Sequence, residues 1–294
     1  MRIGSPRMKL RLGCWFLLAA LCLLSLRVGA QSGAFTPSDS LLEARWAAST
    51  ERMEDTVLGL DFRTLLVQRF AAARRIDIPL PKLQGMGDVL SEDGRVRMIT
   101  WGHPMPLREW HYIGLLVHEY SKDSLQLYPL HDARIPVGDG LIDQELFSQQ
   151  RTPDDWFGSA CYALVPFEQR GQRAYLLLGV AGGNLLVMRR IIEVLSFDDQ
   201  GRPVFGTPAL RHGRDLFGRM LFSHSARVAM TIHPIEKGKR ILIDHLSPSR
   251  PQFAGMPQYY GPDFSQDVLE LQRDGTWLFK SDELVIPPPK ASNK

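Results

Sequence analysis

Residues 160–206, ACYALVPFEQRGQRAYLLLGVAGGNLLVMRRIIEVLSFDDQGRPVFG, contain three runs of apolar residues that are separated by glycine-bearing turns. The first two runs, 161–165 and 175–178, flank a charged segment around Gly171 whose length suits the connection of a β-hairpin. The third run, 191–195, leads into a second turn of the same chemistry. Glycine supplies the positive φ that tight turns require, and the flanking charges keep the turn in water. This stretch predicts an antiparallel meander.

Turns of this kind recur along most of the chain. Three further glycine turns separate β-type runs, at Asp93-Gly94, Lys237-Gly238 and Asp274-Gly275. Together with the two turns above they make five hairpin-type signals, which is typical of an antiparallel β protein. We predict a mainly β domain over residues 83–286. An antiparallel sandwich, an open barrel and a propeller-like meander are all compatible with the pattern.

Residues 31–82 differ from the rest and predict a short helical N-terminal segment with a linker. Asp61 is placed to cap a helix, because apolar residues recur after it at helical spacing: Phe62, Leu65, Leu66 and Phe70. An earlier helix is expected over 41–53. Pro79 and Pro81 end the helical pattern and begin an extended connection to the β domain.

The two ends of the chain have the composition of processing and tail segments. Residues 1–30 combine a basic start, an apolar run over 12–26 and the small residues that precede a signal-peptide cleavage site, so we expect export to the periplasm or the cell envelope. An uncleaved anchor is the alternative. No later segment is long and apolar enough to span a membrane as a helix. Residues 287–294, three prolines and a polar tail, are predicted to be disordered.

Charge and cysteine content narrow the class of partner. Loss of residues 1–30 removes five basic residues and no acidic one, so that the formal net charge changes from +3 to −2. We therefore expect no nucleic-acid partner. Cys161 is the one cysteine after residue 30, which excludes a disulfide within the exported chain and a cysteine metal cluster. In an apolar strand it is expected to be a small buried hydrophobic residue. We predict no metal and no cofactor.

The catalytic candidates are His233 and Asp244. The sequence has no Gly-x-Ser-x-Gly elbow, Walker loop, dinucleotide fingerprint, His-Glu-x-x-His helix or calcium loop. If Lys237-Gly238 closes a hairpin, Thr231, His233 and Asp244 share one face of the sheet, with His233 diagonal to Asp244. A histidine held by a carboxylate can serve as a general base or support a metal ligand. The simpler alternative is a polar cross-strand contact on a sheet face.

The ligand-binding candidates lie in the aromatic segment 258–263 and are Tyr259, Tyr260 and Asp263. Tyrosines beside a carboxylate can stack on a sugar or a peptide and form hydrogen bonds with its polar edge. The alternative is that one tyrosine fills the core while Gly261-Pro262 forms a turn.

A series of short motifs follows the β-type runs from residue 86 to residue 263. They are Met86-Gly87, Ser91-Glu92-Asp93-Gly94-Arg95, Thr100-Trp101, Tyr162, Tyr175-Leu176-Leu177-Leu178-Gly179, Ile191-Ile192-Glu193-Val194-Leu195-Ser196-Phe197, Gly201-Arg202-Pro203-Val204-Phe205-Gly206, Asp244-His245-Leu246 and Tyr259-Tyr260-Gly261-Pro262-Asp263. In this order they resemble a family of uncharacterised exported proteins of Gram-negative bacteria. The resemblance spans most of the chain after residue 30. It implies export and a β architecture and brings no activity with it.

Two functions from different classes follow from these observations. The first is a non-enzymatic, exported β-rich protein that binds a ligand or a protein partner at the cell envelope. The second is an exported hydrolase, with or without assistance from a metal ion, that uses His233 and Asp244 or the histidines of the loops. An enzyme should gather several polar groups at one place, whereas a binding protein should expose the tyrosine segment.

Overall fold

A sheet of apolar strands forms the centre of the fold. The computed structural model describes residues 35–51, 56–104, 110–122, 124–133 and 147–281. This central sheet has the strand order β11-β7-β6-β5, with the bounds Arg219–Ser225, Val187–Phe197, Gln172–Gly183 and Ala160–Gln169, and β8 (Pro203–Phe205) pairs with the end of β7. Successive side chains of a strand point to opposite faces, yet the neighbours Leu176 and Leu177 are both fully buried. The central sheet is therefore covered on both faces.

A helix-side sheet covers one of these faces. Its strand order is β1-β2-β3-β4, with the bounds Gly87–Leu90, Val96–Pro104, Trp110–Ser121 and Ser124–His131. Met98 and Leu116 of this sheet belong to the same buried cluster as Leu177 and Ile191 of the central sheet. The two sheets thus share one hydrophobic core.

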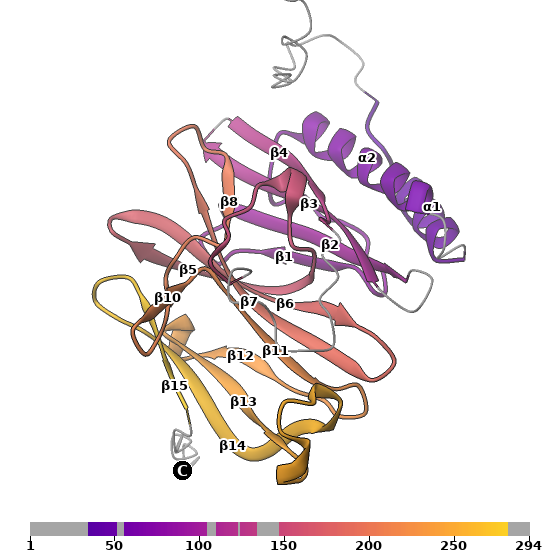
Figure 1. Cartoon of the computed structure of the whole chain (residues 1–294). Coiled ribbons are helices and arrows are strands. Elements are labelled where there is room, and N and C mark those ends of the chain that lie inside the picture. The colour runs from indigo at the N-terminus through magenta and orange to yellow at the C-terminus, as the bar shows by residue number, and fades with distance from the viewer. Residues whose placement is uncertain (1–34, 52–55, 105–109, 123, 134–146, 282–294) are drawn as a thin grey trace, which may run out of the picture. The chain divides into compact units, whose positions relative to one another are not determined.

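Two helices cover the outer face of the helix-side sheet (Figure 1). They are α1 (Asp39–Glu51) and α2 (Thr56–Ala73). The ring of Phe62 in α2 lies 5.2 Å from Trp46 of α1 and 5.3 Å from Trp101 of β2, measured between ring centroids. This aromatic cluster fixes both helices to the sheet. Neither helix of the described ranges combines the length and apolar character needed to cross a membrane.

A C-terminal sheet covers the second face of the central sheet. Its strand order is β10-β9-β15-β14-β13-β12, with the bounds Asp215–Phe217, Leu210–His212, Trp277–Lys280, Tyr260–Leu271, Arg240–Pro248 and Ile232–Ile235. Ile241 and Trp277 pack in one cluster with Leu176 and Ile192 of the central sheet. All pairs are antiparallel except β15 with β9, which is parallel.

The prediction of a mainly antiparallel β protein is confirmed. Strands make up 51% of the structure, and the three sheets are open and stacked. All five predicted turns connect paired neighbours: β1 with β2, β5 with β6, β7 with β8, β12 with β13 and β14 with β15. Local turn chemistry therefore located the hairpins correctly.

The predicted helix cap at Asp61 is wrong, because α2 begins five residues earlier at Thr56. Gly59 lies in this extra turn, and a Cβ added there would come within 2.3 Å of Nε2 of His103. Close packing against the sheet thus stabilises helix where a glycine would otherwise disfavour it. Asp61 instead lies 3.6 Å from Arg45, in an exposed ion pair that joins the two helices.

Some expectations fall outside the described ranges or need correction. The predicted signal peptide, 1–30, and the predicted tail, 287–294, both lie outside the described residues. The sequence of 131–158 has several prolines and glycines and few apolar runs, which predicts a surface excursion. This prediction is wrong for its last part, which enters the core: Trp156 is fully buried, and Arg151 pairs with Phe205.

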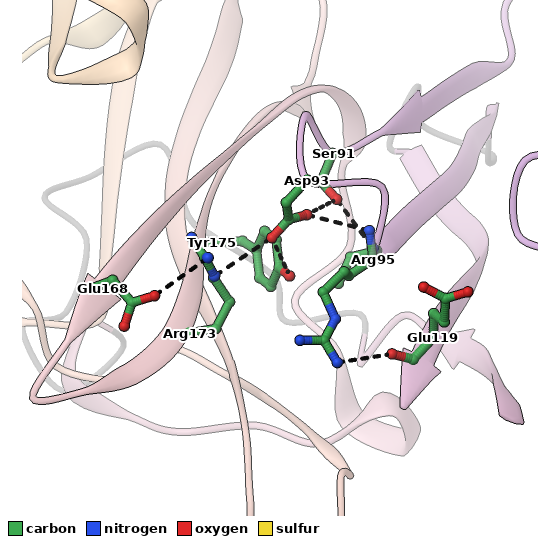
Figure 2. A network of polar contacts seen from close by, with 8 residues as sticks. Ser91, Asp93, Arg95, Glu119, Glu168, Arg173 and Tyr175 are labelled. Atoms are coloured by element: carbon green, nitrogen blue, oxygen red, sulfur yellow. Dashed lines mark hydrogen bonds and ion pairs between the residues drawn. The ribbon is translucent and has the colours of Figure 1, made fainter. Parts of the chain in front are cut away.

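Asp93, in the turn between β1 and β2, joins the helix-side sheet to the central sheet (Figure 2). Its Oδ1 accepts hydrogen bonds from the Ser91 hydroxyl at 2.6 Å and from the Arg95 backbone N–H at 3.3 Å. Its Oδ2 accepts a hydrogen bond from the Tyr175 hydroxyl at 3.0 Å, and Arg173 lies 3.5 Å away. Burial and the Asp93 charge both raise the pKa of Tyr175. Both carboxylate oxygens are engaged by the protein, which indicates a structural role.

Tyr175→Phe should lower the free energy of unfolding by about 1–2 kcal/mol, because it removes the hydroxyl that donates to Asp93 while it keeps the buried ring. Urea denaturation followed by circular dichroism measures this change. Tyr120→Phe is the matched control, since Tyr120 is exposed and should change stability by less than about 0.5 kcal/mol. Equal stability of the two variants would contradict the structural role of Asp93.

His118 of β3 is a second contact between these sheets. Its ring stacks on Phe197 of β7, with centroids 3.7 Å apart and planes 20° from parallel. Burial lowers the pKa of His118 to about 4, and the nearby Arg95 acts in the same direction. The folded protein therefore holds this imidazole neutral at pH values at which an unfolded chain would protonate it.

Stability should fall as the pH decreases from about 6.5 to about 4. In this window the unfolded chain binds a proton on His118 that the folded chain does not, which costs up to about 1.4 kcal/mol for each pH unit. His118→Phe keeps a ring against Phe197 and should flatten the slope of unfolding free energy against pH. His233→Phe, which alters an exposed ring, should leave the slope unchanged. The prediction fails if both variants titrate like the parent protein.

Candidate functional site

The structure places His233 and Asp244 on adjacent strands in the predicted register. Ile232 faces Ile243, and His233 faces Leu242. The backbone N–H of Thr231 donates to Oδ2 of Asp244 at 2.7 Å, so that this carboxylate holds the backbone just before β12 begins. His233 is exposed, and within the described residues no hydrogen bond or ion pair joins it to Asp244. The two residues therefore share a region of the sheet without forming a histidine–carboxylate pair.

His245, the next residue after Asp244, does form such a pair. Its Nδ1 lies 2.8 Å from Oδ1 of Asp267, and the same oxygen accepts a hydrogen bond from the Ser281 hydroxyl at 2.9 Å. Asp267 is buried, which allows it to orient the imidazole. Because Nδ1 faces a carboxylate, it carries the proton, and Nε2 is the basic nitrogen of the ring.

A bulge in the β13–β14 ladder lies beside this pair. The pairing runs from Asp244 with Gln266 to Leu246 with Pro262, so that the three residues 263–265 face His245 alone. Bulges break the alternation of side chains and redirect them. The sequence pattern singles out His233 and Asp244 and gives no signal for the His245 pair, because His245 and Asp267 are 22 positions apart in the chain.

The bulge also presents an aromatic side chain to solvent. Oδ1 of Asp263 accepts hydrogen bonds from the Ser265 hydroxyl at 2.7 Å and the Ser265 backbone N–H at 3.1 Å. The hydrogen bond from the Ser265 hydroxyl is the main cause of a lowered pKa of Asp263, and the nearby His245 acts in the same direction. Phe264, between these residues, has φ +74° and is fully exposed. A left-handed conformation is unfavourable for phenylalanine, so the Asp263–Ser265 contacts must hold it in place.

The two candidate tyrosines have different roles. The Tyr260 hydroxyl accepts a hydrogen bond from the backbone N–H of Gly255 at 3.0 Å, and it thereby closes its own loop. Tyr259 stacks on Phe253, with centroids 4.1 Å apart and planes 17° from parallel, and is 42% exposed. Of the pair, Tyr259 is the one that presents aromatic surface to a ligand.

Tyr259 belongs to a larger apolar surface built by three loops: 184–186 between β6 and β7, 226–231 between β11 and β12, and 249–259 between β13 and β14. We call it the loop surface. Its large exposed apolar side chains have exposed fractions between 42% and 59%, and they are Leu185, Leu186, Val228, Met256 and Tyr259.

The three loops are neighbours in space. The backbone N–H of Ala226 donates to the carbonyl of Leu186 at 2.8 Å. A Cβ added to Gly261, just after the third loop, would lie 3.3 Å from Cγ2 of Val228. The turn that ends in Tyr259 lies beside β11, where the gold turns meet the orange strands in Figure 1. Segments far apart in the sequence thus form one surface.

A third polar group, Glu193 with Arg219, lies inside the core. Both side chains are fully buried, and Nε of Arg219 donates to Oε1 of Glu193 at 2.6 Å. Burial raises the pKa of Glu193, and the Arg219 cation opposes this shift. The guanidinium also lies 5.1 Å from the ring centroid of Phe157. A pair enclosed in this way stabilises strand pairing and is out of reach of an external ligand.

Neither a metal site nor a known relative identifies the function of the described residues. Among the residues that the structure describes, no three histidine, cysteine, aspartate or glutamate side chains gather as a metal site requires. Cys161 is buried, and burial raises the pKa of its thiol to about 12. Comparison of the chain with protein-family models, with curated proteins and with solved structures finds no match. The candidate functional site therefore rests on geometry alone, and the loop surface and the β13–β14 bulge are its two parts.

Proposed function

We propose that this protein is an exported, non-enzymatic binding protein of the cell envelope, and that it binds its partner through the loop surface. The observation that carries the proposal is the exposure of five large apolar side chains, from Leu185 to Tyr259, on three neighbouring loops. Large apolar side chains that gather exposed on neighbouring loops are costly in water and mark an interaction site. Stacked sheets supply the rigid scaffold from which such loops bind.

Export is supported by the composition of residues 1–30. Within the loop surface Tyr259 has the properties of an anchor, because it is rigid, aromatic and stacked on Phe253. Tyr260 and Asp263 support the loop and the bulge from within, through Gly255 and Ser265. The proposal thus assigns the predicted ligand-binding residues to two roles, contact and support.

A photo-crosslinking amino acid at Met256 or Leu186 should form adducts in intact producing cells. The same group at Leu60, an exposed apolar residue of α2, is the matched control and should form none of these adducts. Tyr259→Ala should reduce the yield from Met256 by at least about fivefold, as expected for loss of an anchor worth about 1 kcal/mol or more. The same adducts in equal yield from Leu60, or no adducts from either loop position, would contradict the proposal.

A hydrolase is the second candidate function. Its catalytic pair would be His245 and Asp267, which are 2.8 Å apart, in place of His233 and Asp244. A base held in this way typically contributes about a hundredfold or more to a rate. The Ser281 hydroxyl also contacts this pair, since it donates to the same oxygen of Asp267 at 2.9 Å.

Hydrolysis of p-nitrophenyl acetate separates the two candidates. If the protein is a binding protein, the parent, His245→Ala and His233→Ala should all show the same background rate. A loss of about a hundredfold in His245→Ala, with His233→Ala unchanged, would establish the hydrolase instead. Circular dichroism of each variant verifies that the fold is intact.

A further inference from the structure

We infer that the loop surface docks on an anionic lipid bilayer. The inference rests on the proposed function and gives its partner a chemical class. Three features of the loops carry it: their charge, the kind of side chains at their tips, and the pairing of their backbone.

The loop surface is basic, although the chain after residue 30 is slightly acidic. Its three loops contain 20 residues, with two arginines, Arg227 and Arg250, both exposed, and no lysine, aspartate or glutamate. The whole chain has 32 acidic residues in 294, so about two would be expected in a segment of this length. Arginine beside an anionic headgroup surface is attracted to it. The charge of the loops thus matches a negatively charged partner.

Two of the carboxylates on the adjoining strands β13 and β14 accept hydrogen bonds from the backbone. Asp244 accepts a hydrogen bond from the backbone N–H of Thr231, and Asp263 accepts one from the backbone N–H of Ser265. These hydrogen bonds hold both carboxylates against the backbone without cancelling their negative charge, so the electrostatic match to an anionic surface rests on Arg227 and Arg250.

The apolar side chains lie at separate loop tips, as expected for insertion among lipids. Leu185 and Leu186 are at the tip of a hairpin, where Oδ1 of Asn184 accepts hydrogen bonds from the backbone N–H groups of Leu186 and Val187 at 2.8 and 2.9 Å. Val228, Met256 and Tyr259 come from the other two loops. A bilayer accepts such separate tips without a complementary shape, and tyrosine is favoured at its interface.

Most backbone N–H groups of the third loop are already paired, which lowers the cost of entering an interface with little water. In 249–259, six N–H groups donate to acceptors of the chain between Arg250 and Tyr260, and Pro251 and Pro257 have no N–H. The donors are Ser249, Phe253, Ala254, Gly255, Met256 and Tyr259. An unpaired polar group would resist transfer into lipid.

Vesicle flotation tests the inference with the exported chain, residues 31–294, which lacks the apolar run 12–26. Vesicles that contain phosphatidylglycerol should carry the protein upward, whereas pure phosphatidylcholine vesicles should not, and added salt should weaken binding. Arg227→Glu with Arg250→Glu should reduce binding by at least about thirtyfold, since each basic residue contributes about fivefold. Leu185→Ser with Leu186→Ser should reduce it by at least about tenfold. Arg214→Glu and Leu216→Ser, on exposed positions around β10, are the matched controls and should bind like the parent.

A fluorescent label reports directly whether the loop surface contacts the vesicle. In a background with Cys14→Ser and Cys22→Ser, an environment-sensitive dye on Leu186→Cys should shift to the blue with anionic vesicles, and a dye on Leu60→Cys should not. The buried thiol of Cys161 does not compete for the dye. This readout is independent of residues 12–26, whose apolar run would hold an unprocessed chain on any vesicle.

The outcomes separate the two proposals. Absence of a blue shift at Leu186, or equal binding to both lipid compositions, overturns the inference. If the crosslinks from Met256 map to a protein while vesicles do not bind, the lipid assignment fails and the binding proposal stands. If neither vesicles nor crosslinks are found, both fail.

Discussion

The central sheet must be covered on both of its faces, and the rest of the structure depends on this constraint. In β6 and β7 the apolar residues follow one another without alternation, as in Leu176-Leu177-Leu178. A sheet of this kind exposes a hydrophobic face unless a layer packs on each side. The helix-side sheet and the C-terminal sheet are these layers, and the helices in turn cover the outer face of the first.

The buried pair of Glu193 and Arg219 acts within this constraint. The two residues face each other across β7 and β11, so that the guanidinium donates to Oε1 of the carboxylate where water is excluded. A slip of one residue in β11 would move Arg219 to the opposite face and leave Glu193 buried without its cation, which is strongly unfavourable. The register of β11 is thereby fixed, and with it the position of the loop 226–231 that follows.

Much of the architecture could be predicted from local patterns, and the stacking of the sheets could not. Glycine turns located the five hairpins because a positive φ is a local requirement. The parallel pairing of β9 with β15 joins residues more than 60 positions apart, for which no local signal exists. The start of α2 was misplaced for the same reason, since Gly59 is accommodated by its contact with His103 on a distant strand.

The candidate site likewise has residues that local sequence predicts and residues that only the folded structure identifies. The tyrosine segment was recognisable by composition, but only burial separates Tyr259, which is exposed, from Tyr260, which closes its loop. His245 was missed because its partner, Asp267, lies 22 positions away on the next strand, and no local pattern joins the two residues. The Leu185-Leu186 pair continues an apolar run in the sequence and reads as buried strand. It becomes exposed because the hairpin turns at Asn184, whose side chain accepts two backbone N–H groups and directs both leucines outward at the end of the sheet.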